Sequence, residues 1–256
     1  AQHVTSFFHQ LQWEAGFYVG CLQLHRALTK AGVGVCWPDP LTSTERTFET
    51  TGLVDLSLAV RRGSAPVPND ISASARPLVM LTGANQGGKT VLLRSVGAAQ
   101  LLMQAGVFVP AVSFRSEVVA NVHTHFRQGE DDRLVSGRLD EELARMSRIV
   151  DRCRPGDLVL MNESFASTDE IEGSYIGQAI IDALVGHGVR VVIVTHLHAL
   201  AKHYLNRPGT LFLRAERLPD GRRTFRVLPD QPQPTSHGFD IYEQVFGDDH
   251  PRRGSP

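Results

Sequence analysis

Hydrophobic side chains recur with two different periods along this chain. Between residue 4 and about residue 30 they return at helical spacing, and the glycines and prolines of residues 32–40 end that pattern. From residue 77 onward, short continuous apolar runs alternate with stretches of helical spacing. The pattern therefore predicts one long N-terminal helix, followed by strands and helices in alternation.

The individual elements follow from the length and composition of each run. Apolar or alternating runs predict strands at residues 52–60, 77–83, about 118–126, 157–164 and 189–196. Helical spacing predicts helices at residues 90 to about 106, about 138–152 and 173–184. Turn-forming composition predicts a loop at residues 61–76, and a β-hairpin is expected from residues 210–218 and 224–228 on either side of "PDGRR".

Fully apolar strands that alternate with helices indicate an α/β fold, with a mostly parallel sheet flanked by helices on both faces. Ligands bind such sheets beyond the carboxyl ends of the strands. Three polar segments directly follow predicted strands, namely the glycine-rich run at 83–90, "NES" at 162–164 and "TH" at 195–196. We therefore expect these segments to meet at one edge of the sheet.

The amino-acid composition is consistent with the predicted α/β fold and adds little to it. The chain has 256 residues, 42% hydrophobic and 21% charged, with a net charge of −1, which is ordinary for a globular protein. A neutral balance without a Lys/Arg cluster argues against a DNA-binding module in its own right. No apolar run is long enough to span a bilayer, so no membrane partner is expected.

The cysteines and the N-terminus indicate the setting. Cys21, Cys36 and Cys153 fit neither a zinc spacing nor a disulfide framework, which predicts reduced thiols in a cytoplasmic protein. The N-terminus lacks the pattern of a signal peptide and an initiator Met. We therefore interpret the chain as a piece of a longer parent.

The run "GANQGGKT" matches the pattern G-x-x-x-x-G-K-T. Glycines let backbone N–H groups point inward around phosphates, and the following helix adds its N-terminal dipole. Lys89 would reach the β and γ phosphates, and Thr90 would ligand Mg²⁺. A plain glycine-rich turn is the alternative, but the strand before and the helix after favour nucleotide binding. The predicted ATP-binding residues are Gly83, Ala84, Asn85, Gln86, Gly87, Gly88, Lys89 and Thr90.

Two strand ends supply candidate catalytic groups. Glu163 ends an apolar strand and is placed to polarise an attacking water. Asn162 precedes it and would contact Mg²⁺ through a water, without adding charge. His196 ends another apolar strand and would contact the γ phosphate or the water. A solvent-facing cap for Glu163 and a locally satisfied histidine are the competing interpretations.

Two further patterns carry weaker signals. The H-x-H pairs His123/His125 and His196/His198 suggest a metal, but we set that aside because no matching carboxylate or cysteine cluster accompanies them. Ser136 is typical of a helix N-cap, and Gly137 beside it allows close approach of an anion. Taken alone, the pattern of Ser136 and Gly137 indicates a plain helix cap.

Together these segments resemble the ATPase domain of the MutS family of DNA mismatch repair proteins, in its MutS-related branch. The similarity covers about residues 48–246 and rests on motifs that occur in the family's order. The motifs are "VPND" with "GANQGGKT", "EDDRLVSGRLDEELARM", "LVLMNESFASTDEIEG", "VTHLHALA" and "PTSHGFDIY". The first 40 residues resemble the end of the helical lever arm of that family.

The resemblance implies an ABC-class P-loop ATPase that uses Mg²⁺ and ATP in composite sites across a homodimer. One protomer would supply residues 85–90, Glu163 and His196, and the other would present Ser136 and Gly137 to the γ phosphate. A lever or connector would occupy residues 1–45 and the ATPase domain residues 46–256. DNA would bind to parts of the parent outside this chain, in repair or recombination.

Two departures from the family pattern leave alternatives open. Asn162 stands where Asp is usual, so a dimerisation module gated by nucleotide, with little or no turnover, competes with the ATPase interpretation. The aromatic residue that stacks on adenine is replaced near Pro66, and Arg226 is a candidate to stack instead.

Overall fold

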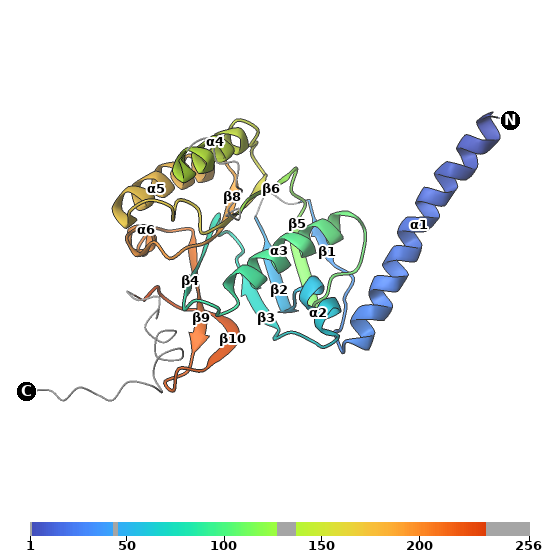
Figure 1. The fold of residues 1–256 in the computed structure, drawn as a ribbon, viewed down its shortest axis with the longest axis horizontal. Coiled ribbons are helices and arrows are strands. Elements are labelled where there is room, and N and C mark those ends of the chain that lie inside the picture. Colours follow the sequence, from blue (N-terminus) through green and yellow to red (C-terminus); the bar gives the residue numbers. More distant parts are fainter. Residues whose placement is uncertain (1, 43–45, 127–136, 234–256) are drawn as a thin grey trace, which may run out of the picture.

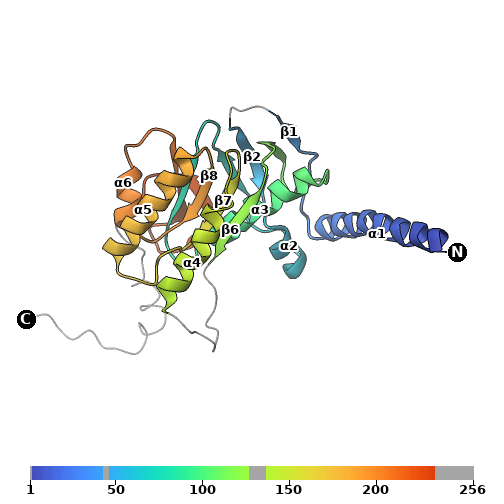
Figure 2. The same ribbon diagram turned by 90° about the horizontal axis from the view of Figure 1, so that it is seen from above.

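A computed structural model describes residues 2–42, 46–126 and 137–233. In these ranges the chain forms two β-sheets and six helices (Figure 1). The N-terminal helix α1 (Gln2–Lys30) projects away from the body in both views (Figures 1 and 2). Only its C-terminal end packs against the body, where Leu28 is buried beside Ala59 and Phe108. The predicted long N-terminal helix is confirmed.

The larger sheet has six strands and carries the apolar runs predicted from the sequence. Its order is β10-β9-β4-β8-β7-β6, and every neighbouring pair is parallel except the hairpin of β9 and β10. The predicted mostly parallel sheet and the hairpin are confirmed. The strands are β4 (Leu78–Gly83), β6 (Val122–Phe126), β7 (Leu158–Asn162), β8 (Arg190–Val194), β9 (Thr210–Arg217) and β10 (Arg223–Pro229).

Successive side chains of a strand point to opposite faces of the sheet, so these apolar strands present apolar side chains on both faces. Helices cover both of these faces. Leu81, Leu160 and Val192 face α3 (Lys89–Gln104) on one side. Met80 and Met161 face the opposite side. That second face is covered by α4 (Arg138–Val150), α5 (Glu170–Gly186) and α6 (His198–Tyr204).

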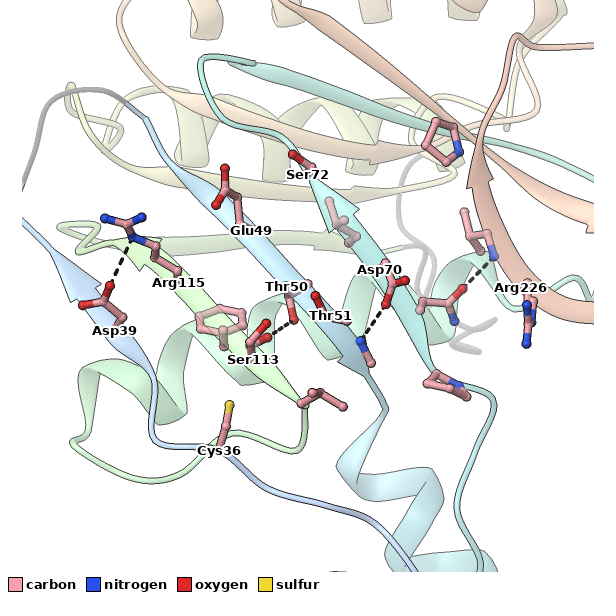
Figure 3. Close-up of a pocket in the computed structure, with 18 of the residues that line it drawn as sticks. Cys36, Asp39, Glu49, Thr50, Thr51, Asp70, Ser72, Ser113, Arg115 and Arg226 are labelled. Atoms are coloured by element: carbon pink, nitrogen blue, oxygen red, sulfur yellow. Dashed lines mark hydrogen bonds and ion pairs between the residues drawn. The ribbon is translucent and has the colours of Figure 1, made fainter.

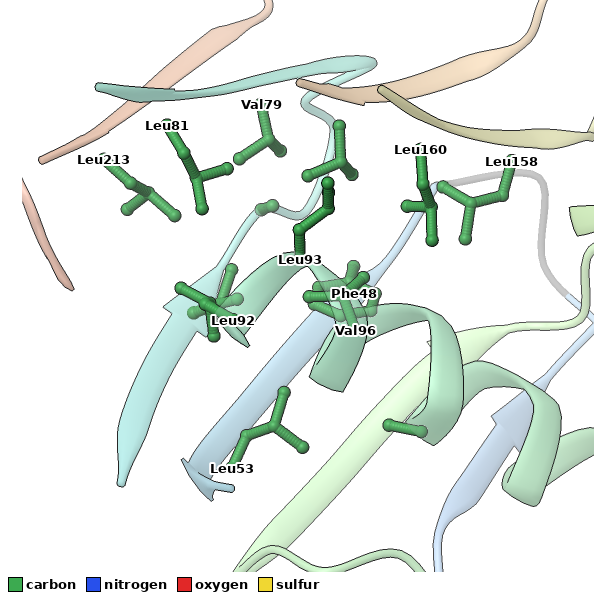
Figure 4. Close-up of a cluster of buried hydrophobic side chains, with 14 of the residues drawn as sticks. Phe48, Leu53, Val79, Leu81, Leu92, Leu93, Val96, Leu158, Leu160 and Leu213 are labelled. Carbon is green, nitrogen blue, oxygen red and sulfur yellow. The ribbon is translucent and has the colours of Figure 1, made fainter. Parts of the chain in front are cut away.

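Helix α3 lies between the large sheet and a second, four-stranded sheet. Phe48 and Leu53 of the small sheet belong to the same buried cluster as Leu92 and Val96 of α3 (Figure 4). This cluster extends along α3 from Leu92 to Met103, and so it holds the helix that begins directly after the glycine-rich run. The small sheet has the order β1-β5-β2-β3, formed by β1 (Asp39–Leu41), β2 (Phe48–Leu53), β3 (Asn69–Ser72) and β5 (Ser113–Glu117).

Some predicted elements are wrong in type or extent. Residues 52–60 were expected to form a strand, but helix α2 (Leu56–Arg62) starts there. Asp55 caps it by accepting a hydrogen bond from the Leu58 N–H at 2.6 Å, and Gly63 ends it in the left-handed conformation at φ 65°. The predicted loop at 61–76 contains β3, and the strand expected at 118–126 starts only at Val122.

The described part of the chain has no helix that is long and apolar enough to cross a membrane. Cys21, Cys36 and Cys153 are all free thiols, which agrees with the expectation that they form no disulfide framework.

Candidate functional site

The glycine-rich run forms a tight loop between the end of β4 and the start of α3. Gly83 and Gly88 have φ of 102° and 92°, and Gln86 has φ of 59°. A Cβ added to Gly87 would lie 2.7 Å from the Ala215 Cβ of β9. Glycine is therefore required both for the backbone conformation and for the packing of the loop on β9. Helix α3 starts directly after Gly88, so its first-turn amides face the loop.

Lys89 lies buried beneath this loop. Its side chain is 4% exposed, and Nζ donates hydrogen bonds to the carbonyl oxygens of Gly83 at 2.7 Å and Ala84 at 2.8 Å. Burial lowers the pKa of Lys89 to about 8; the charge of Arg223 acts in the same direction and the Glu163 carboxylate opposes it. Below that pH a buried cation is held at the loop, and an anion brought close to it would raise the pKa again.

Thr90 and Asn162 join the start of α3 to the end of β7. The Thr90 hydroxyl donates to the Asn162 Oδ1 across 2.9 Å. Hydroxyl and amide oxygens are hard ligands that suit Mg²⁺, which keeps several of its waters when bound. These two side chains therefore fit a hydrated divalent cation, although neither brings a negative charge.

Glu163 and His196 face each other at the ends of neighbouring strands. The His196 Nε2 lies 3.1 Å from the Glu163 Oε1, and both side chains are partly exposed. Glu163 has φ of 53°, and its N–H donates to the Val194 carbonyl oxygen at 2.8 Å. The three polar segments predicted to converge on one edge of the sheet do lie there together.

A cavity of about 360 Å³ lies against the loop, and we call it the loop pocket. Residues 85–90, Glu163 and Arg94 line it, together with Pro66, Val67 and Phe225 from more distant segments. The sequence analysis missed Phe225, which belongs to β10 and lies close to Gly88. No regular alternation in the sequence could have found it, because Phe225 has φ of 61° and lies where the register of β10 shifts, between Arg223 and Val227.

Arg226, also in β10, does not line the loop pocket. It lines a separate groove of about 940 Å³ on the outer face of the small sheet (Figure 3). Asp39 and Arg115, paired residues of the neighbouring strands β1 and β5, form an ion pair at 3.1 Å and also line that groove. Of these two neighbours, Phe225 and not Arg226 lines the loop pocket.

The expectation that no carboxylate or cysteine accompanies the H-x-H pairs is wrong for His123. Ligand atoms of His123, Cys153 and Asp157 lie within 4.8 Å of one another. Asp157 accepts hydrogen bonds from Asn121 at 3.0 Å and from the Arg154 N–H at 2.9 Å, and it contacts His123 at 3.0 Å. Burial raises the pKa of the Cys153 thiol to about 11, with the Asp157 charge adding to it. Hydrogen bonds explain this group, and we assign no metal to it.

The predicted helix cap is described only in part. Ser136 lies outside the described residues, as do the loop before it and the segment "PTSHGFDIY". Gly137 is the exposed N-cap residue of α4, and no side chain caps the helix there. Asp140 and Glu141 lie in its first turn.

Comparisons with known proteins agree with this geometry. The family model for MutS domain V matches residues 79–241, and the model for the MutS2 N-terminal domain matches residues 1–31. Endonuclease MutS2 of Geobacillus kaustophilus (strain HTA426) is 35% identical over 184 residues, covering 70% of this chain and 23% of the relative. Endonuclease MutS2 of Ligilactobacillus salivarius (strain UCC118) is 27% identical over 253 residues, covering 96% of this chain and 31% of the relative.

This chain thus spans about a quarter to a third of the length of these curated relatives. The MutS domain V match extends over more than half of the chain and includes the loop, both strand-end groups and α4. The resemblance noted in the sequence is therefore confirmed: the chain belongs to the MutS domain V family.

Proposed function

We propose that this chain binds Mg²⁺ and ATP and hydrolyses ATP to ADP and phosphate. The observation that carries the proposal is the meeting of Lys89, the Thr90–Asn162 pair and the Glu163–His196 pair at the edge of the sheet where the loop pocket lies. The groups come from the start of α3 and the ends of β7 and β8, and each has the chemistry that one part of a triphosphate needs.

The loop would hold the phosphates. Backbone N–H groups of the loop and of the first turn of α3 favour negative charge. The Lys89 ammonium would leave the carbonyl oxygens of Gly83 and Ala84 and contact the β and γ phosphates. The phosphates replace two carbonyl acceptors with charged ones, so the exchange favours the bound state.

Glu163 and His196 would act on the attacking water. The Glu163 carboxylate would orient and polarise it toward the γ phosphorus, whose bond to the bridging oxygen of ADP breaks. His196, within hydrogen-bond distance of Glu163, would contact the water or the γ phosphate. Thr90 and Asn162 would hold the hydrated Mg²⁺, which neutralises phosphate charge when bound.

Phe225 would contact the base. It lines the loop pocket opposite Pro66 and Val67 and is 48% exposed. An aromatic face stacks on any purine with little geometric demand, so this contact supports nucleotide binding without selecting adenine.

The remaining expectations concern the assembly. We infer a homodimer in which Ser136 and Gly137 of each protomer complete the site of the other. The exposed N-terminal end of α4 supports this, because a helix N-terminus attracts phosphate. Residues 1–45 would act as a lever or connector for an ATPase domain at 46–256. DNA would bind to parts of the parent outside this chain, in repair or recombination.

A second candidate is a dimerisation module that binds nucleotide but turns over little. Asn162 favours it, since an uncharged amide next to Thr90 gives weaker metal binding than a carboxylate would. Nucleotide would then shift a population between monomer and dimer by its differential affinity.

ATP turnover by a Lys89→Ala variant tests the leading proposal. Loss of the buried ammonium removes a charged contact to phosphate, so we expect turnover to fall by at least about a hundredfold. Lys202→Ala, at an exposed position on α6, is the matched control and keeps parental turnover. Parental turnover in Lys89→Ala would contradict the proposal, whereas nucleotide binding without turnover in the parent would favour the gated dimer.

A further inference from the structure

A buried histidine connects β6, α4 and the loop that follows Glu163. His125 is 1% exposed, with Nε2 3.1 Å from the Glu142 carbonyl oxygen and Nδ1 2.6 Å from the Ser164 Oγ. A carbonyl oxygen only accepts, so Nε2 carries the proton and Nδ1 accepts from the Ser164 hydroxyl. A neutral His125 therefore satisfies both of its neighbours at once.

The side chain of Glu142 makes the second connection. Its carboxylate is buried, and Oε2 accepts a hydrogen bond from the Phe165 N–H at 2.8 Å. The Phe165 ring is fully buried and stacks on His125 with the ring centroids 5.7 Å apart. A bond from a buried amide to a carboxylate is stronger than one between neutral groups. We call Glu142, His125 and Ser164 the α4 latch.

The segment held by the latch has an unfavourable backbone. Glu163 and Phe165 both have positive φ, at 53° and 64°, a conformation that non-glycine residues keep only when their surroundings impose it. Two hydrogen bonds do so here, from the Glu163 N–H to Val194 and from the Phe165 N–H to Glu142. The position of the Glu163 carboxylate thus depends on a side chain of α4.

Helix α4 packs against the core along one side, through Leu139 and Leu143 in its N-terminal half and Met146 in its C-terminal half. Arg145 Nη1 donates to the Phe126 carbonyl oxygen at 2.8 Å, and Met146 is buried in the core. Gly137, at the other end, is exposed. A shift of the segment after Glu163 would be transmitted through Glu142 to the N-terminal turn of the same helix, which begins after the exposed Gly137.

We propose that the α4 latch makes the Glu163 segment and the N-terminal end of α4 move together. Glu142 is then a positioning residue. Resting on the proposed function, this coupling connects the carboxylate of a protomer's own site to the surface that it presents to its partner's nucleotide. The position of the N-terminal end of α4 would then depend on whether the protomer's own site holds a γ phosphate.

The placement of Glu142 argues for a role beyond filling space. Glu142 occupies a buried position on the side of α4 where Leu139, Leu143 and Met146 pack against the core. An apolar residue would avoid the cost of burying a carboxylate, but it would leave the Phe165 N–H without this acceptor. The buried charge is therefore tied to the conformation of the Glu163 segment.

NMR of the nucleotide-free protein tests the coupling without assuming any ATPase activity. Glu142→Ala is expected to shift the imidazole signals of His196 and to speed exchange of the Phe165 amide by at least about tenfold, because a charged hydrogen bond is lost. Glu142→Gln keeps an acceptor oxygen and should restore most of that protection. Glu141→Ala, on the same turn of α4, is the control and should leave the His196 signals unchanged.

A change at Ser164, on the loop side of the α4 latch, tests the same coupling in the reverse direction, from the loop to α4. Ser164→Ala removes one hydroxyl and should shift the backbone amide signal of Gly137, at the far end of α4. Because Ser164→Ala is the smaller change, it still tests the coupling if the Glu142→Ala variant does not fold. His196 signals identical to the parent's in a folded Glu142 variant, or an unmoved Gly137 signal in Ser164→Ala, would overturn the coupling, whether or not the chain hydrolyses ATP.

A kinetic measurement then separates positioning from binding. In Glu142→Ala we expect the turnover number to fall by at least about tenfold with nucleotide affinity within about twofold of the parent, since the loop itself is unaffected. Equal losses of affinity and turnover would contradict a positioning role. Absence of turnover in the parent would count against the proposed function alone.

Discussion

Single residues at the loop pocket are placed by partners that lie far away in the sequence. Lys89 is held by carbonyl oxygens of its own loop, but Thr90 is held by Asn162 and Glu163 by His196. These pairings depend on parallel strands that end at one edge of the sheet. The chemistry proposed for each residue therefore follows from the register of the sheet as much as from the residue type.

The buried His125 gives the protein a pH-dependent stability. Burial lowers the pKa of His125 below 6.5, with the charge of Arg145 adding to this and the bond to Glu142 opposing it. The unfolded chain thus binds a proton that the folded chain excludes. Stability is fully present above pH 6.5 and falls as the pH drops below that value, with a limiting slope of about 1.4 kcal/mol per pH unit for one proton.

Chemical denaturation between pH 5 and pH 8 measures this effect in the parent and in His125→Gln. All other titrating groups are shared, so the difference between the two slopes isolates His125. We expect the parent to lose stability more steeply than the variant below pH 6.5. Parallel curves would show that His125 takes up its proton equally well in the folded state.

The sequence allowed part of the site to be predicted at this scale. Glu163 and His196 could be named because they directly follow continuous apolar runs. Glu142 and Phe225 could not, because their significance depends on contacts with segments distant in sequence. Within the helical pattern, Glu142 reads as an ordinary polar position, and only the fold reveals that it meets the Phe165 N–H.

Secondary-structure elements are set by local signals at their ends as well as by periodicity. The three buried strands and α3 were predicted because their apolar runs are long and unambiguous. Residues 52–60 were assigned wrongly, because a short apolar run fits both a strand and a helix. The Asp55 cap and Gly63 decide for a helix there, and both were visible in the sequence.

Asp55 is expected to control the stability of α2 and its contact with α3. It is 4% exposed, caps α2 through the Leu58 N–H and pairs with Arg94 of α3 at 3.2 Å. Asp55→Ala should lower the free energy of unfolding by about 1–2 kcal/mol, mainly through loss of the cap. Urea denaturation provides the measurement.

Asp55→Asn separates the cap from the ion pair. It retains an oxygen for the Leu58 N–H but loses the charge opposite Arg94, which is 45% exposed. Because exposed partners contribute little, Asn should preserve most of the parental stability. A loss in Asn as large as in Ala would show that the ion pair, and not the cap, matters at this position.

At the scale of the whole molecule, two features point outward from the body. Helix α1 extends away from the body (Figure 2), and it carries exposed apolar side chains such as Phe7 and Trp13. Helix α4 presents its N-terminal end at Gly137. In the proposed function, residues 1–45, which include α1, would act as the lever or connector, and the N-terminal end of α4 would complete the partner's site.

In the proposed function, the Glu163 carboxylate orients the water that hydrolyses ATP, in a site that two protomers share. ATP turnover per protomer, measured across a range of protein concentrations with Mg²⁺ present, tests it most directly, with Glu163→Gln as the blank. We expect specific activity to rise with protein concentration in the parent and to vanish in Glu163→Gln. Specific activity independent of concentration would contradict the composite site, and parental activity in Glu163→Gln would contradict the role of the carboxylate.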